Sequence, residues 1–405
     1  MITRTERDIF EDALRNIRTI TDRNAVKFGF DFPGPNTEKG IYPFSPSVSL
    51  LGSEGEILEH KEGSNTGWTT GFWSGILWLL HEFYASEKPY KNILEAHLKS
   101  FKDRAERKID SGHHDVGFLY SLSCLPAVRL YNDQEACRTA INAADILCSR
   151  FIEKAGIIQA WGELNDPEES GKIIIDSLMN LPLLYWAGEK TGDPRYRNCA
   201  YRHALNAAAN LVRADGTTYH TFYFDPETGR PLRGNTKQGY SADSCWARGQ
   251  AWAVYGFVLS YHFTRDPDFL NAARKTASRF LSSLPEDKVA YWDLIFNDGD
   301  LQERDSSAAA IAACGLLELA GLTGISKNEE GRKYYESAKD IVLSLCRDYT
   351  PRNDTVNEGL ILHGVYYKGG DIGVDESNLW GDYFYLEALL RLIGPGSGGR
   401  YFFAL

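Results

Sequence analysis

Two aspartates, Asp115 and Asp176, are the residues best suited to carry out chemistry in this chain. Asp176 is the single carboxylate within an otherwise apolar stretch, residues 172–186, and Asp115 directly follows His113 and His114. Cleavage of glycosidic bonds commonly uses two carboxyl groups, one of them protonated at the working pH. The pair therefore suggests acid–base chemistry on a sugar.

Each aspartate also has a purely structural interpretation, because Asp is a preferred residue at helix N-termini. Pro182 predicts a helix that begins a few residues before it, which places Asp176 at or near the helix start. An apolar surround raises the pKa of a carboxyl, whereas a helix N-terminus lowers it. Capping and catalysis both remain open for the two aspartates. His113 and His114 likewise have a structural and a functional interpretation.

Aromatic residues make up 13% of the chain and include nine tryptophans. A tryptophan face suits the apolar face of a pyranose ring, although most tryptophans pack in protein cores. Arg248 lies between Trp246 and Trp252, and an arginine recognises a carboxylate through two parallel hydrogen bonds. The alternative for Arg248 is an ion pair inside the protein. Five tryptophans lie near the rim of the barrel that the helical pattern predicts: Trp68, Trp161, Trp246, Trp252 and Trp380.

Twelve stretches have helical spacing of apolar residues, and two kinds alternate along the chain. One kind is apolar nearly all round, as in buried helices, and the other has one charged face, as in outer helices. This alternation predicts an all-α (α/α)6 barrel of six inner and six outer helices. The inner stretches are 71–78, 116–120, 177–186, 249–255, 307–319 and 383–392; the outer ones are 7–24, 90–108, 134–154, 196–213, 267–283 and 330–347. Strand signals are confined to 219–224 and 289–295.

Polar clusters precede or open the predicted inner helices. In an alternating barrel the inner helices run in one direction, so their N-termini meet at one rim. Helix N-termini favour anions. We therefore expect a pocket for a sugar acid at that rim. The clusters are 68–70, 113–115, Asp176, 246–248, 304–306 and 380–382.

Composition restricts the remaining functions. The chain has 405 residues and a formal net charge of −11, which argues against nucleic-acid binding. No secretory signal and no run long enough to span a bilayer are expected, and the seven scattered cysteines suggest free thiols in a reducing cytoplasm. Phosphate-loop, dinucleotide and metalloprotease motifs are absent from the sequence, and the spacing of the cysteines suggests no zinc site. We expect a single barrel domain over 1–393 and a flexible tail over 394–405, with no signal for an oligomeric state.

Several motifs resemble the unsaturated glucuronyl hydrolases of glycoside hydrolase family 88. The resemblance runs from about residue 65 to residue 392, with the motifs long and in order. They are 113–120, 158–162, 174–186, 219–226, 246–252, 304–307 and 380–383.

The resemblance implies an (α/α)6 barrel without a metal or organic cofactor, acting on oligosaccharides left by polysaccharide lyases. Such substrates carry a 4,5-unsaturated uronic acid at the non-reducing end, and the implied reaction is hydration of its C4=C5 enol ether. Asp176 would protonate C4 and help water to add at C5, while Asp115 would hold ring hydroxyls. The resemblance places eight further residues around the unsaturated ring: Trp68, His114, Trp161, His220, Gln238, Trp246, Arg248 and Trp252. Among them we assign the contact with the substrate carboxylate to Arg248, on charge alone.

One loop departs from the pattern of members that prefer sulfated substrates. These members place two serines and a lysine at positions occupied here by Tyr367, Gly370 and Ile372. Lys368 could replace the missing lysine as a sulfate-binding cation from a different position in the loop, whereas Asp371 would repel an anion. We therefore expect unsulfated or less sulfated disaccharides.

Three alternatives remain open. An unsaturated rhamnogalacturonyl hydrolase shares the barrel and the aspartate pair. A non-catalytic sugar-binding barrel needs no proton donor, and a sugar epimerase on a similar barrel relies on paired histidines.

Overall fold

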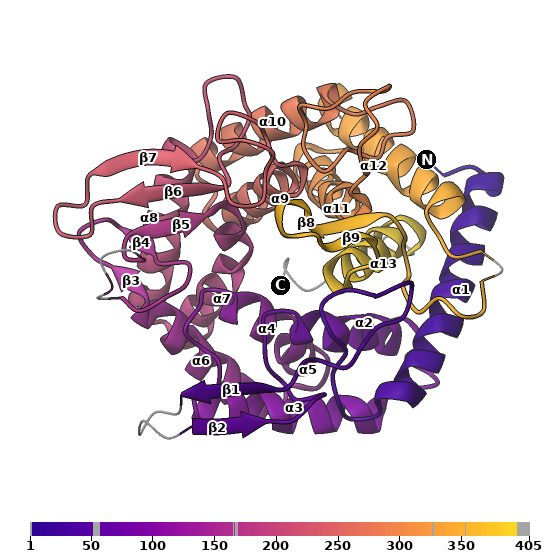
Figure 1. The fold of residues 1–405 in the computed structure, drawn as a ribbon, viewed down its shortest axis with the longest axis horizontal. Helices are drawn as coiled ribbons and strands as arrows, with labels where there is room; N and C mark the ends of the chain where they lie inside the picture. Colours follow the sequence, from indigo (N-terminus) through magenta and orange to yellow (C-terminus); the bar gives the residue numbers. More distant parts are fainter. Residues whose placement is uncertain are drawn as a thin grey trace.

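A ring of alternating helices forms the molecule in the computed structural model, which describes residues 2–51, 57–164, 166, 169–325, 328–352 and 354–394. Figure 1 shows the inner helices around the centre and the outer helices at the periphery. The predicted (α/α)6 barrel is confirmed. The inner helices are α2 (Thr70–Phe83), α4 (Val116–Ser123), α7 (Leu181–Thr191), α9 (Ala247–Thr264), α11 (Ser306–Thr323) and α13 (Leu379–Ile393); the outer ones are α1 (Arg4–Phe28), α3 (Lys91–Glu106), α6 (Gln134–Ser149), α8 (Pro194–Asn210), α10 (Pro267–Ser282) and α12 (Glu329–Asp348). A short helix, α5 (Leu125–Tyr131), follows α4 directly. The predicted tail, 394–405, lies outside the described residues except for Gly394.

Burial explains why the two kinds of helix differ in composition. The inner helix α11 is long and apolar enough to cross a membrane by length and composition alone, yet 78% of it is buried inside the barrel. The expectation that no stretch reaches that length is therefore wrong. The physical reason is that a helix enclosed by neighbours is apolar all round, just as a membrane helix is.

Glycine lets the inner elements approach each other closely. A Cβ atom on Gly117 of α4 would come within 2.4 Å of the Asn180 Cα, directly before α7. The Asn180 side chain then accepts a hydrogen bond from the Phe118 amide at 2.7 Å. These contacts hold the start of α4 against the turn that carries Asp176.

Short antiparallel strands supplement the helices. They form four small sheets: β1 (Val48–Leu51) with β2 (Ile57–His60), β3 (Phe151–Ile152) with β4 (Ile157–Ile158), β5 (Lys172–Ile174) with β6 (Thr221–Phe224) and β7 (Pro231–Asn235), and β8 (Gly364–Tyr367) with β9 (Ile372–Glu376). The predicted strand at 219–224 is confirmed as β6. The predicted strand at 289–295 is wrong, because only isolated bridges occur there, Trp246 with Asp293 and Tyr291 with Arg304.

The β5–β6 pairing brings two distant segments to one place. Ile174 at the end of β5 pairs with Thr221 at the start of β6. The Ile175 amide then donates to the His220 carbonyl at 3.0 Å. His220 is thereby placed beside Asp176, although 44 positions separate them in the sequence.

Candidate active site

A cavity of about 180 Å³ opens at the N-terminal ends of the inner helices. Both candidate catalytic aspartates and seven of the eight predicted binding residues line it. The full set is Trp68, Asp115, Trp161, Ile174, Asp176, His220, Lys237, Gln238, Trp246, Arg248, Trp252 and Tyr366. Ile174, Lys237 and Tyr366 were not predicted, although Lys237 adjoins Gln238, and Tyr366 directly precedes Tyr367 in the loop that departs from the sulfate-binding pattern.

The predicted shared rim is correct for four of the six polar clusters. The clusters before α2, α4, α7 and α9 contribute side chains to the cavity. In the other two clusters, Trp380 and Asp305 do not line the cavity but contact residues that do. Trp380 is fully buried and stacks on Trp68 with ring centroids 4.9 Å apart, and Asp305 pairs with Arg248. Arg304 instead forms ion pairs with Asp287 and Asp298, both at 3.2 Å, away from the cavity.

Asp176 does not cap the helix that follows it. It lies in a 3₁₀ helix, η1 (Ile175–Met179), while α7 begins only at Leu181, with Asn180 in the capping position and Pro182 in the first turn. Of the two interpretations of Asp176, capping is therefore ruled out for α7, because this helix starts later than Pro182 alone suggests. Asp176 is left facing the cavity, and its Oδ1 atom has no hydrogen-bond partner among the described residues.

Burial decides the protonation state of Asp176. Desolvation, reinforced by the nearby charge of Asp115, raises the pKa of Asp176 well above its usual value, and Arg248 offsets this only in part. The apolar surround thus outweighs the local backbone hydrogen bonds. Asp176 is a carboxylic acid that keeps its proton at a pH where ordinary carboxyls are ionised, as a general acid requires.

Asp115 has the opposite character. It occupies the N-terminal capping position of α4 without a capping hydrogen bond from its side chain. Burial raises the pKa of Asp115, but the contacts with His114, His113 and Asn180 outweigh it and hold the pKa below its usual value. Two carboxyl groups whose pKa values are pushed apart can divide the acid and base roles between them.

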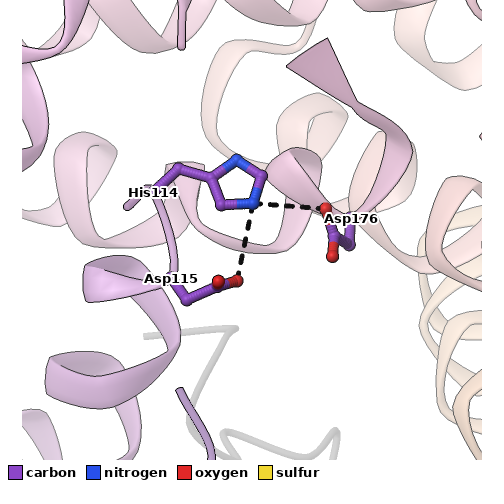
Figure 2. A group of neighbouring side chains, drawn as sticks. All are labelled: His114, Asp115 and Asp176. Carbon is purple, nitrogen blue, oxygen red and sulfur yellow. Dashed lines mark ion pairs between the residues drawn. The ribbon is translucent and has the colours of Figure 1, made fainter. Parts of the chain in front are cut away.

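His114 lies between the two carboxyl groups, as Figure 2 shows. Its Nε2 atom is 3.5 Å from Asp115 Oδ1 and 3.4 Å from Asp176 Oδ1. The imidazole is fully buried, which lowers the pKa of His114 to about 4, so it is neutral near pH 7. His114 is therefore a spacer behind the cavity wall, which corrects its predicted place in the lining.

His114, Asp115 and Asp176 also form a group that could hold a metal ion, since their ligand atoms lie within 4.8 Å of one another. A metal ion there would use the Asp176 oxygen that an acid role requires to be protonated. The two uses of Asp176 are mutually exclusive.

A buried hydrogen-bond chain fixes the turn that carries Asp176. The Ile158 amide donates to His203 Nδ1 at 2.8 Å, so the proton of this neutral ring is on Nε2. His203 Nε2 then donates to Ser177 Oγ at 2.7 Å, and Ser177 Oγ donates to the Ile174 carbonyl at 2.6 Å. The outer helix α8 is thereby connected to η1.

The guanidinium of Arg248 is already bonded to other groups of the protein. Its Nη1 forms an ion pair with Asp305 at 3.0 Å and donates to the Val365 carbonyl, while Nη2 donates to the Tyr366 carbonyl at 2.7 Å. Arg248 and Asp305 are 2% and 0% exposed. The structural alternative weighed for Arg248, an internal ion pair, is confirmed, and the side chain also forms part of the cavity wall.

Comparison with known proteins gives a consistent result. The Glycosyl Hydrolase Family 88 model matches residues 52–381. The chain is 45% identical over 384 residues to an unsaturated glucuronyl hydrolase of Bacillus sp. (strain GL1), covering 95% of this chain and 97% of that protein. It is 44% identical over 380 residues to an unsaturated chondroitin disaccharide hydrolase of Streptococcus pyogenes serotype M1, covering 94% and 89%.

A solved structure agrees with these sequence matches. The crystal structure of an unsaturated glucuronyl hydrolase from Streptococcus agalactiae superposes with a TM-score of 0.87 at 42% identity, covering 97% of this chain and 93% of that one. The resemblance found in the motifs is confirmed over nearly the whole chain. The protein is a member of glycosyl hydrolase family 88.

Proposed function

We propose that this protein is an unsaturated glucuronyl hydrolase that acts on lyase-generated glycosaminoglycan oligosaccharides. It releases the 4,5-unsaturated glucuronic acid from their non-reducing end by hydrating the C4=C5 enol ether. The observation that carries the proposal is that Asp176 and Asp115 face one cavity of about 180 Å³, where burial raises the pKa of Asp176 while contacts with His114, His113 and Asn180 lower the pKa of Asp115. Relatives named for unsaturated glucuronyl and chondroitin disaccharide substrates support the substrate class.

The proposed mechanism uses Asp176 twice. Its proton adds to C4, and the positive charge that develops at C5 is shared with the ring oxygen and stabilised by the Asp115 carboxylate. A water molecule attacks C5 and gives its proton to the Asp176 carboxylate, which restores the acid. The resulting hemiketal opens, and the remaining sugar leaves.

Tryptophans and polar side chains hold the unsaturated ring in this proposal. Trp68, Trp161, Trp246 and Trp252 supply apolar faces, and His220 and Gln238 supply hydrogen-bonding groups. His114 separates the two carboxyls, and Arg248 supports the wall through Asp305.

The near-ultraviolet absorbance of the conjugated alkene tests this function. Wild type is expected to consume the alkene of an unsaturated chondroitin disaccharide, and Asp176→Asn to lose at least about a thousandfold in kcat, since Asn holds no transferable proton. Full activity in Asp176→Asn would refute the role of Asp176. Faster turnover of a pectin-derived disaccharide would favour the rhamnogalacturonyl alternative, and absence of turnover with retained binding would favour a sugar-binding barrel.

The preference for unsulfated disaccharides is part of the proposal. Lys368, the substitute cation in the loop, forms an ion pair with Glu303 at 2.5 Å and does not line the cavity. Comparing kcat/KM for sulfated and unsulfated chondroitin disaccharides tests this preference.

We also propose that 1–393 is a single catalytic domain and that the enzyme works in the cytoplasm, where the cysteines remain reduced.

A further inference from the structure

An unsaturated uronate brings a carboxylate into the cavity, and the neighbouring sugar can bring a sulfate ester. Binding such an oxyanion is favoured by a positive charge that is not already neutralised. Arg248 and Lys237 are the two cationic side chains among the described residues lining the cavity. They differ in what already surrounds them.

Arg248 is already neutralised. Its guanidinium pairs with the fully buried Asp305, and both terminal nitrogens donate to protein oxygens. An anion that bound there would compete with a buried ion pair whose disruption is costly. The assignment of the substrate carboxylate to Arg248 on charge alone is therefore weakened.

Lys237 is in the opposite situation. It lies between β7 and α9, is exposed to solvent and lines the cavity beside Gln238. Its ammonium is 5.0 Å from the centroid of the Trp161 ring, which also lines the cavity. Within the part of the chain that the structure describes, no carboxylate forms an ion pair with Lys237.

Lys172 provides a contrast at the same tryptophan. Its ammonium is also 5.0 Å from the Trp161 centroid, but Lys172 is only 7% exposed and forms an ion pair with Glu169. Lys172 does not line the cavity. Of the two lysines on Trp161, only Lys237 presents its charge to a ligand.

We propose that Lys237 binds an oxyanion of the substrate and thereby contributes to specificity, with Trp161 holding the ammonium at the mouth of the cavity. This proposal rests on the proposed function for the class of substrate. The oxyanion is the carboxylate of the unsaturated ring or a sulfate ester on the next sugar, which share the chemistry that a lysine recognises.

Equilibrium binding in the Asp176→Asn background tests the proposal without depending on turnover. Titration calorimetry would use three ligands: the unsulfated unsaturated chondroitin disaccharide, its uronate methyl ester and its 6-sulfated form. We expect Lys237→Met to weaken binding of the unsulfated acid or of the sulfated form about fivefold. Lys237→Arg should restore binding to within about twofold, and Lys172→Met is the matched control that should leave the Kd nearly unchanged.

The ligands separate the two sources of the oxyanion. A loss seen with the acid but absent with the uncharged ester identifies the carboxylate, whereas a loss confined to the sulfated form identifies the sulfate. Either loss should shrink when the ionic strength is raised to about 0.5 M. Equal losses for all three ligands would show a merely structural role, and unchanged Kd values would show no contact; both overturn the proposal.

Failure of the proposed function would look different. Wild type would then leave the alkene intact, while the binding comparison would still decide the role of Lys237. A disaccharide that neither binds nor reacts would remove both proposals together.

Discussion

At the scale of single residues, the proposed chemistry depends on two carboxyl groups whose pKa values are shifted in opposite directions by their surroundings. Asp176 is desolvated and repelled by a neighbouring charge, which raises its pKa, whereas Asp115 is held ionised by its contacts with histidines and Asn180. His114 keeps them apart without carrying a charge itself, since burial lowers its pKa to about 4. The pKa of Asp176 thus depends on the charge of Asp115, so the two groups titrate as a pair.

The dependence of turnover on pH should reflect these opposite shifts. In the proposed mechanism the active form has Asp176 protonated and Asp115 ionised. We therefore expect kcat to fall as the pH rises through the raised pKa of Asp176, and also as the pH falls through the lowered pKa of Asp115. A kcat–pH profile measured by alkene absorbance checks both limbs. A profile in which turnover keeps rising into alkaline solution would contradict the acid role of Asp176.

Replacing Asp176 should also stabilise the fold at higher pH. The folded-state pKa is raised, so its contribution to stability is present below the unfolded-state pKa and is lost as the pH rises toward the folded-state pKa. Asp176→Asn removes that cost, and its free energy of unfolding should exceed that of wild type by at least about 1 kcal/mol at pH 8. Denaturant unfolding at pH 4 and pH 8 measures it; a gain of equal size at both values would point to a cause other than titration.

At the scale of elements, the site depends on a short 3₁₀ turn anchored from outside the ring. Ser177 in η1 is bonded to His203 of α8, while Asn180 links the same turn to α4. A side chain on such an anchored turn keeps its position when substrate enters, which is what proton transfer to a defined carbon requires.

Removing the anchor should therefore slow the reaction more than it weakens binding. Ser177→Ala leaves the His203 Nε2–H without its acceptor, and we expect kcat to fall about tenfold with KM nearly unchanged, together with about 1–3 kcal/mol of lost stability. Steady-state kinetics and denaturant unfolding measure the two effects.

The inner helix α2 offers a matched control for this variant. Ser74 is bonded to the buried His97 at 2.9 Å, away from the aspartate pair. Ser74→Ala should cost similar stability but leave kcat close to wild type. Equal losses of kcat in both variants would mean that general destabilisation, and not the position of η1, explains the result.

At the scale of the whole molecule, the ring brings together residues that are distant in sequence. The cavity is built from side chains between Trp68 and Tyr366, because parallel inner helices open on one face of the barrel. The small strands complete the wall: β5 and β6 position His220 beside Asp176, and β8 supplies Tyr366. The barrel thus positions the site through its closest helix contacts.

One such contact can be tested at Gly117. A Cβ atom there would come within 2.4 Å of Asn180, whose backbone cannot move without shifting α7. Gly117→Ala should destabilise the fold by about 3 kcal/mol, measured by denaturant unfolding, and lower kcat as well. Gly321→Ala in α11 is the control, since no atom beyond its chain neighbours and the backbone of its own helix lies within 4 Å of its Cβ position. This variant should be neutral or stabilising by up to about 1 kcal/mol.

The sequence by itself determined the architecture and the identities of most residues at the site. Helical periodicity is a local property, so alternating apolar and amphipathic stretches sufficed to predict both helix layers and the shared rim. The motifs around Asp115, Asp176, His220 and Arg248 were sufficient to predict a common cavity. Short strands such as β8 and β9 were not predicted, because a few residues of extended chain carry little periodic signal.

Only the tertiary structure decided how these residues behave. Whether burial or the helix terminus controls the pKa of Asp176 depends on its depth and on the distance to Asp115, 61 positions earlier in the sequence. The charge available at Arg248 likewise depends on Asp305, which directly precedes the inner helix α11. Lys237 and Lys172 both lie against Trp161, but they differ in exposure and in their ion-pair partners. Charge and protonation are set by contacts between distant segments, and those contacts exist only once the ring has closed.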